Sequence, residues 1–382
     1  MVVERARDLQ PYLAEWEELA RRSVEPNPFY EPWMLLPAVE AFGSGHDFQF
    51  LLIFGSAGHN SGEKVLCGFF PMVRSRRYQR QWVGVRVLEL YKYPHCGFCL
   101  PLVRGGCVAE TLEAFLSWYV GQAGYTSLLK LSLVSADGEF YNGWRQCLDR
   151  FPRLRTVSEK VERALLRTTG GSQDSIDQTI SSRHRKHLRR SRELLSEIGE
   201  IRYVNVRRGA DAETWIERFT ELEVSGWKGE KGTALASMDT SRNFFREAAH
   251  TGLSSGALTM FAMFVGAECV AMKCVLRSAA AMFIFKIAYN ETFARYSPGV
   301  LLEIEHQRQV AEDGTTEWID SCAPPNHSMY NRIWKERRVL ERVLVARRRS
   351  PGWVLAKAIA RWREYVIRRD ERNRAALEAT QR

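Results

Sequence analysis

Residues 285–302 read FKIAYNETFARYSPGVLL, and this stretch carries the strongest structural signal in the chain. Its apolar start predicts a strand that ends near Ala288, the polar residues that follow predict a loop, and Ser297-Pro298-Gly299 predicts the start of a helix. Serine is a favoured N-cap residue, and proline is favoured at the first helical position. A strand-to-helix turn that exposes backbone N–H groups binds anions, and the helix dipole strengthens the effect. The pattern therefore indicates either a phosphate site or an ordinary capped helix.

Arg295 stands just before the predicted helix start. Its planar guanidinium carries several N–H donors, a geometry that suits phosphate groups. We therefore predict that Arg295 contacts the pyrophosphate of a cofactor. The alternative is a solvated arginine beside an ordinary helix.

The segments before and after this stretch predict a second half of mixed α/β type. Three strand-like runs with turn-like breaks between them predict an antiparallel meander. In chain order we expect a basic helix at 184–198, a strand at 201–206, helices at 211–226 and 241–251, strands at 258–265, 269–277 and 281–288, a helix at 298–313 and a strand at 317–320.

The first half shows a less clear version of the same order, with helices and strands mixed, which is typical of α/β or α+β domains. Among its strands we expect two short ones, at 153–156 and 162–167. Residues 170–175 read GGSQDS, and this composition predicts a linker. We therefore expect an N-terminal domain over 1–169, a C-terminal domain over 170–349 and a C-terminal helix over 350–382. The length of 382 residues and the 45% apolar content suit two globular domains.

Several motifs, taken in their order along the chain, resemble those of one superfamily. They are Asn27-Pro28-Phe29-Tyr30 with Trp33, the basic run 182–190, Trp227-Lys228-Gly229, the stretch 285–302, and Asp320 followed by Tyr330-Asn331-Arg332-Ile333-Trp334. Together they resemble the GNAT acyltransferases, among them the cellulose-biosynthesis-type acetyltransferases, and more distantly the FemAB-type transferases. The resemblance covers about residues 8–346. It implies an α/β fold of tandem GNAT-like domains, with mixed sheets flanked by helices.

The resemblance also implies an activity, namely direct transfer of an acyl group from acetyl-CoA or another acyl-CoA to an amine or a hydroxyl. Such enzymes align the donor carbonyl with the nucleophile and polarise it with backbone N–H groups. The expected acceptor is a small molecule or a glycan, in exopolysaccharide or cell-envelope biosynthesis. Two alternatives stay open. One is a FemAB-like aminoacyl transferase, and the other is a non-catalytic scaffold of a polysaccharide-synthesis complex, because Pro298-Gly299 offers one glycine where a glycine-rich turn is usual.

Candidate site residues follow from the same resemblance. Tyr289 is the candidate proton donor to the leaving thiolate, and Asp320 is the candidate base. The alternatives are a packing role for Tyr289 and a turn or capping role for Asp320. Trp227, Lys228 and Tyr330 are the candidate acceptor contacts. The predicted donor contacts are Lys286, Arg295, Ser297, Pro298, Gly299 and Val300. The alternatives are a lysine at the edge of a strand that extends its charge to solvent for Lys286, and a core position for Tyr330.

Composition and cysteine usage exclude several classes of protein. No run of roughly eighteen apolar residues exists, so we expect no membrane-spanning helix. The N-terminus lacks the apolar core of a signal peptide, so we expect a cytoplasmic protein. Of eight cysteines, Cys96 and Cys99 form a C-x-x-C pair without the second cluster that a zinc site needs, and we expect reduced thiols and no metal.

The net charge of +10 is concentrated at the C-terminus. Residues 335–382 contain 15 basic and 6 acidic residues, a net +9, which leaves the rest of the chain near neutral. We therefore expect no sequence-specific nucleic-acid partner. The basic run 183–192 predicts a solvated helix face or a contact with a polyanion.

The tail beyond Ser350 predicts an amphipathic helix, because Leu355, Ile359, Trp362 and Val366 recur at helical spacing. Basic residues surround this stripe. Two interpretations stay open: a peripheral contact with the inner face of a membrane, or a terminal helix that packs its stripe against the body of the protein.

Overall fold

The structure is a computed structural model that describes residues 1–56, 64–75, 85–122, 126–168, 180–206, 211–226, 229, 231–232 and 234–380. Its strands are β1 (Val2–Val3), β2 (Asp47–Ser56), β3 (Lys64–Ser75), β4 (Val87–Leu90), β5 (Leu102–Val103), β6 (Leu128–Ser135), β7 (Leu154–Arg167), β8 (Ile201–Val206), β9 (Leu258–Val265), β10 (Glu268–Ser278), β11 (Ala281–Tyr289), β12 (Trp318–Asp320) and β13 (Glu336–Arg347).

The helices are α1 (Leu13–Arg22), α2 (Pro32–Phe42), α3 (Val108–Gly121), α4 (Gly138–Asp149), α6 (Ser182–Ile198), α7 (Ala212–Val224), α9 (Asp239–Ser255), α10 (Pro298–Asp313), α11 (Ser328–Ile333) and α12 (Pro351–Thr380). Short 3-10 helices are η1 (Ala6–Tyr12), η2 (Pro28–Tyr30), η3 (Leu235–Ser237) and η4 (Glu291–Tyr296).

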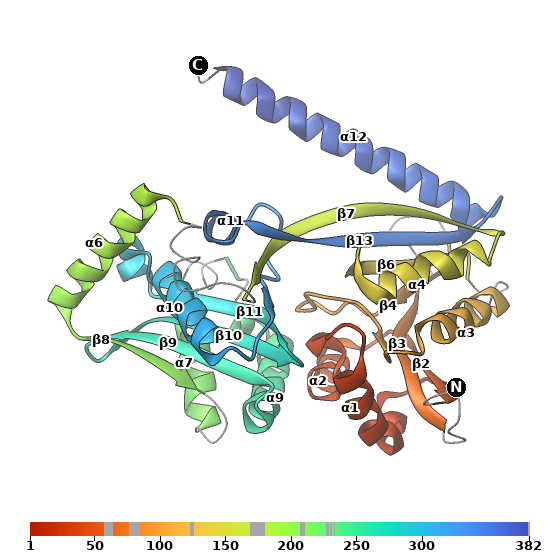
Figure 1. Cartoon of the computed structure of the whole chain (residues 1–382), viewed down its shortest axis with the longest axis horizontal. Helices are drawn as coiled ribbons and strands as arrows, with labels where there is room; N and C mark the ends of the chain where they lie inside the picture. The colour runs from red at the N-terminus through yellow and green to blue at the C-terminus, as the bar shows by residue number, and fades with distance from the viewer. Residues whose placement is uncertain are drawn as a thin grey trace.

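The described strands form one mixed sheet of thirteen strands that runs through both halves of the molecule (Figure 1). The order across it is β1-β2-β3-β4-β6-β13-β7-β12-β11-β10-β9-β8, and β5 pairs with β3 outside this path. Strand β9 is buried along its whole length, because helices cover both faces of this half of the sheet.

The last strand of the chain completes the first half of the sheet. Strand β13 lies between β6 and β7 and pairs antiparallel with both, so residues 336–347 fold with strands from the first half of the sequence. Strand β7 in turn pairs with β12 of the second half through Arg167 and Trp318. The long ribbon of β7 and β13 therefore connects the two halves (Figure 1), and a boundary at 169/170 does not separate their strands.

Helices cover opposite faces of the second half of the sheet. On one face, α7 and α9 pack on Phe283 and Phe285 in a core that continues into the first half. On the other face, α10 packs on Met282 and Ile284 in a separate core. The first half contacts the second through α2, which packs against α9.

One glycine permits this contact between the halves. A Cβ atom at Gly252 of α9 would lie 2.7 Å from Cζ3 of Trp33 in α2 and 2.8 Å from Cβ of Leu258. Leu258 is buried in the core and the half-buried Trp33 packs against it, so the helices approach closely only because Gly252 has no side chain.

The predicted order of elements in the second half is confirmed from β8 to β12, and the helix predicted at 184–198 is α6. One expectation about the middle of the chain is wrong, and one strand near its end was missed. The stretch predicted as two strands, at 153–156 and 162–167, is the single strand β7, and β13 was not predicted. The expected linker at 170–175 lies outside the described residues, so the domain boundaries stay predictions.

We predict that Gly252→Ala destabilises the protein, because the added methyl group overpacks the contact between α9 and α2. The expected loss in the free energy of unfolding, measured by chemical denaturation, is about 1–3 kcal/mol. Gly121→Ala is the matched control, because a Cβ atom there meets no atom within 4 Å. Equal stability of the two variants would contradict the proposed role of Gly252.

Candidate functional site

A β-bulge in β11 turns two neighbouring side chains toward the same face of the sheet. Cys274 of β10 pairs with Lys286, and the next residue, Val275, pairs with Ile284, so Phe285 is an extra residue in the ladder. Bulges of this kind re-aim side chains and occur often beside active sites. Lys286 therefore points to the face covered by α7 and α9, as Phe285 does.

The sheet opens next to this bulge. Strands β11 and β12 run parallel only from Ala281 to Phe283 of β11, because β12 ends at Asp320 while β11 continues to Tyr289. A cavity of about 610 Å³ lies where the two strands separate, a volume typical of small-molecule sites. Its lining comprises Leu222, Glu223 and Gly226, residues 284–289, Ala294, residues 297–300, residues 321–324 and residues 327–330.

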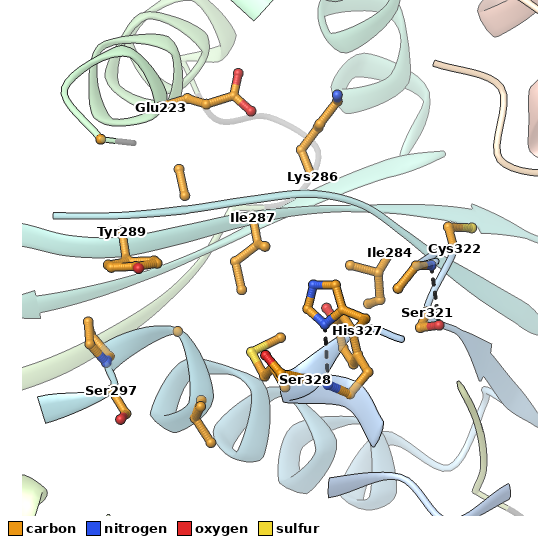
Figure 2. Close-up of a pocket in the computed structure, with 18 of the residues that line it drawn as sticks. Glu223, Ile284, Lys286, Ile287, Tyr289, Ser297, Ser321, Cys322, His327 and Ser328 are labelled. Atoms are coloured by element: carbon orange, nitrogen blue, oxygen red, sulfur yellow. Dashed lines mark hydrogen bonds between the residues drawn. The ribbon is translucent and has the colours of Figure 1, made fainter. Parts of the chain in front are cut away.

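The cavity reaches around the edge of β11 and so has two sides. Figure 2 shows Glu223 and Lys286 on one side of the strand, and Ile287, Tyr289 and Ser297 on the other. The first side faces α7, and the second faces the start of α10. Neighbouring residues of a strand face apart by alternation, and the bulge at Phe285 decides that Lys286 takes the α7 side and Ile287 the α10 side.

The start of α10 forms the far wall of the cavity. Pro298 occupies the first helical position, as predicted, and Ser297 occupies the N-cap position. The predicted cap itself is not formed, because the side chain of Ser297 makes no capping hydrogen bond and its backbone is left-handed, with φ 55° and ψ 49°. A left-handed backbone costs a non-glycine residue about 1–2 kcal/mol, and such strain is typical of functional turns.

Arg295 does not line the cavity. It is exposed at the end of η4, where its guanidinium lies 4.6 Å from the centre of the Tyr296 ring and donates to Tyr296 Oη at 2.5 Å. Helix α6 packs against this 3-10 helix and brings exposed cations, among them Arg190 and Arg192, to this end of the molecule. The predicted contact of Arg295 with a pyrophosphate therefore stays a prediction that needs a different side-chain position.

Lys286 is held by a residue from the first half of the chain. His95 Nδ1 lies 3.2 Å from Lys286 Nζ, and His95 Nε2 lies 3.2 Å from Ser241 Oγ. Burial, together with the nearby Lys286 charge, lowers the pKa of His95 to about 3. The imidazole is therefore neutral at physiological pH, so Nδ1 accepts from the Lys286 ammonium and Nε2 donates to Ser241.

Tyr289 lies on the α10 side of the cavity. Partial burial raises the pKa of its phenol, and the neighbouring Glu291 raises it further through its charge and a hydrogen bond. The phenol is therefore protonated at neutral pH. This state is the one that a proton donor to a leaving group requires.

Asp320 is fully buried at the end of β12 and is not among the residues that line the cavity. Its Oδ2 accepts from Arg163 at 2.5 Å and from Arg338 at 2.6 Å, and its Oδ1 accepts from the Cys322 N–H at 2.8 Å. Although burial opposes ionisation, the two guanidiniums lower the pKa of this carboxyl. A carboxylate saturated in this way is a poor base, so the geometry supports the structural alternative rather than the catalytic role suggested by the sequence.

Tyr330 lines the cavity from α11 but is only 2% exposed. Its hydroxyl donates to Glu303 Oε2 at 3.4 Å, and Lys273 Nζ donates to the same oxygen at 2.6 Å. Burial raises the pKa of Tyr330 well above its usual value. Tyr330 thus forms part of the cavity wall, whereas Trp227 and Lys228 lie outside the described residues.

Sequence reasoning missed part of this site. Among the described lining residues, Glu223 carries the one carboxylate, and its Oε2 accepts from the Leu235 N–H at 2.7 Å. His327 caps α11 and lies on the wall opposite Lys286 (Figure 2). Glu223 stands just before the Trp227 motif and His327 between Asp320 and Tyr330, so their places beside recognised motifs were the available signal. No such signal pointed to His95.

We predict that Asp320→Asn lowers the free energy of unfolding by about 3–5 kcal/mol, because it leaves two buried guanidiniums without their carboxylate. The folded pKa of Asp320 is lower than its unfolded value, so its ionised form stabilises the protein above about pH 4 and this contribution is lost as the pH falls. Denaturation curves should therefore show a large difference between wild type and variant at neutral pH that shrinks in acid.

The exposed pair of Asp239 with Arg242 supplies the control, because Asp239→Asn removes a carboxylate that is 85% exposed and should change stability little. An Asp320→Asn protein of unchanged stability that loses only its turnover would restore the catalytic role.

Comparison with known proteins agrees with this geometry. Residues 182–335 match the family described as "Acetyltransferase (GNAT) domain". No curated protein matches the chain. The fold is similar to that of several solved structures at low identity. FemX has a TM-score of 0.58 and 11% identity, with 94% of this chain and 100% of that chain covered.

A conserved protein of unknown function from Bacteroides thetaiotaomicron has a TM-score of 0.54 and 12% identity over 91% and 99% of the two chains. The C-terminal domain of a putative lysylphosphatidylglycerol synthetase from Agrobacterium fabrum has a TM-score of 0.52 and 12% identity over 92% and 94%. The predicted fold class, a mixed α/β sheet flanked by helices with GNAT-like relatives, is confirmed. The cavity at the separation of β11 and β12 lies within residues 182–335, the segment that matches the acetyltransferase (GNAT) domain.

Proposed function

We propose that this protein is an acyltransferase that moves an acyl group from an acyl-CoA to an amine or a hydroxyl of a small molecule or glycan. The observation that carries the proposal is the separation of β11 from β12, which exposes a strand edge to a cavity that ends at the start of α10. The GNAT match of residues 182–335 supports the same chemistry.

In this proposal the donor lies on the α10 side. An extended chain with amide groups can hydrogen-bond to an exposed strand edge in the way that an added strand does. Its phosphates then reach the N-terminus of α10 at Pro298 and Gly299, where the helix dipole favours negative charge. Glycine at position 299 leaves this path open. A side chain there would start beside Ile287 and Tyr289, since an added Cβ atom would lie 3.5 Å from Cδ1 of Ile287 and 3.9 Å from Cδ1 of Tyr289.

The acceptor lies on the α7 side, beside Glu223 and Lys286. The nucleophile attacks the thioester carbonyl carbon, its proton passes to the Glu223 carboxylate directly or through water, and the carbon–sulfur bond breaks as the acyl group transfers. The thiolate takes a proton from Tyr289. Lys286, anchored by His95, places a positive charge at the bulge between the two sides, where negative charge develops on the carbonyl oxygen.

A second candidate is an aminoacyl transferase of the FemAB type, which the motif resemblance also implied. The exposed basic side chains of α6, which packs against η4, favour a larger polyanionic donor than CoA. The acceptor pathway, exopolysaccharide or cell-envelope biosynthesis, and the cytoplasmic location are further proposals that rest on the resemblance.

Calorimetry with acetyl-CoA tests the donor. We expect binding in the micromolar range to the wild-type protein. Gly299→Val should weaken it at least tenfold, about 1.4 kcal/mol, because the added side chain fills the wall between Ile287 and Tyr289. Gly121→Val is the control, since its added Cβ meets open space. If the protein does not bind acetyl-CoA but accepts aminoacyl-tRNA, the second candidate replaces this donor. If it uses neither donor, the non-catalytic scaffold is the remaining alternative.

Lys286→Met separates donor binding from chemistry. Because Lys286 faces the α7 side, we expect unchanged affinity for acetyl-CoA in the same calorimetric experiment and a loss of turnover of about a hundredfold or more once an acceptor is found. A clear loss of acetyl-CoA affinity would instead show that Lys286 contacts the donor, as the motif resemblance implied.

A further inference from the structure

The first turns of α12 are packed on the body of the protein. A Cβ atom at Gly352 would lie 2.0 Å from the carbonyl oxygen of Ser127, so the helix begins in direct contact with the start of β6. Ala356 and Ile359 are buried against Leu344 and other residues of the sheet. This face of α12 therefore has its partner within the chain.

A second apolar stripe on the same helix has no such cover. Val354 is 66% exposed, Trp362 is 61% exposed and Tyr365 is 64% exposed. These residues, with the exposed Ala358, follow helical spacing and lie along one side of α12. The stripe predicted from the sequence is thus divided: Ile359 packs on the body, whereas Trp362 faces away from it.

Positive charge flanks the exposed stripe. Residues 351–369 contain five basic residues and one acidic residue, a net +4. Lys357, Arg361 and Arg368 are exposed. In Figure 1 helix α12 starts at its contact with the body near one end of the β7–β13 ribbon and extends diagonally away from that ribbon.

We propose that this stripe of α12, defined by Val354, Ala358, Trp362 and Tyr365, docks on a lipid surface that carries anionic headgroups. Tryptophan and tyrosine favour the boundary between headgroups and acyl chains, and flanking arginines bind the headgroup phosphates. The helix lies in the plane of the surface, since none of the helices in the described residues is long and apolar enough to cross a bilayer.

The charge distribution favours a lipid surface over a second copy of the chain. Two copies joined through this stripe would bring Arg361 and Arg368 of each helix together, and like charges oppose such a contact. An anionic surface neutralises the same side chains. The proposal goes beyond the transfer reaction and does not depend on it.

Co-sedimentation of the full chain with vesicles tests the proposal. We expect binding to vesicles of phosphatidylcholine mixed with phosphatidylglycerol, little binding to pure phosphatidylcholine, and release at high salt. Arg361→Gln with Arg368→Gln should weaken the partition roughly fivefold for each charge removed. Trp362→Ser with Tyr365→Ser should weaken it at least about tenfold, because the apolar contact is lost.

Two controls match these variants on another helix. Ile198→Ser removes an apolar side chain that is 54% exposed on α6, and Arg183→Gln with Arg190→Gln removes two exposed charges there. All variants should melt at the wild-type temperature, because the altered side chains are exposed, and both α6 controls should bind vesicles as the wild type does.

Three outcomes of the vesicle experiment would overturn the proposal: a wild-type protein that does not bind anionic vesicles, α12 variants that bind as well as the wild type, or loss of binding in the α6 charge variant alone. Sedimentation velocity without lipid tests whether a second copy of the chain, rather than a lipid surface, covers the stripe. A wild-type dimer that Trp362→Ser with Tyr365→Ser converts to a monomer would assign the stripe to a second copy of the chain and likewise overturn the lipid assignment.

Discussion

The buried carboxylate of Asp320 is the constraint on which the centre of the molecule depends. Arg163 reaches it from β7 and Arg338 from β13, and the same two guanidiniums also bind the carbonyl of Gly97 and the carboxylate of Glu25. Buried charges are tolerated only when each finds its partners. The strands can satisfy all of them only in one register, so the cluster specifies how the last strand of the chain inserts between β6 and β7. The same carboxylate accepts from the Cys322 N–H at the point where β12 ends and the cavity begins.

The cavity divides its chemistry between the two faces of the sheet. Because the bulge at Phe285 turns Lys286 toward α7, the charged groups Lys286 and Glu223 are kept apart from the apolar wall and helix start on the α10 side. His95 adds a neutral acceptor from the first half, so the proposed acceptor side is assembled from both halves. Between α10 and β10, Lys273, Glu303 and His306 form a fully buried network. It includes the hydroxyl of Tyr330 and so fixes that wall. Although burial opposes ionisation of Glu303, the Lys273 ammonium and His306 lower its pKa to about 2, and burial together with the Lys273 charge lowers the pKa of His306 to about 4.

The sequence predicted the part of the site that depends on interactions between neighbouring residues. Strand, loop and helix start were evident in residues 285–302 because apolar periodicity, proline and the residues around it act within a few positions of each other. The bulge was not evident, since it is defined by the pairing of β11 with β10. Arg295 shows that closeness in sequence does not decide where a side chain points, because its guanidinium stacks on Tyr296 instead of facing the helix start. The role of Asp320 could not be predicted from its neighbours in sequence. Its partners Arg163 and Arg338 come from distant strands, and no pattern around position 320 indicates them.

The sequence by itself determined the α/β class, the order of elements in the second half, the family motifs and the basic amphipathic character of the tail. These follow from periodicity, composition and short motifs, which are properties of neighbouring residues. Only the tertiary structure decided that β13 joins the first half, that Asp320 is an ion-pair centre, that His95 holds Lys286, and which stripe of α12 remains uncovered. Each of these depends on contacts between residues far apart in the chain, and such contacts are fixed by strand register and packing rather than by any local preference.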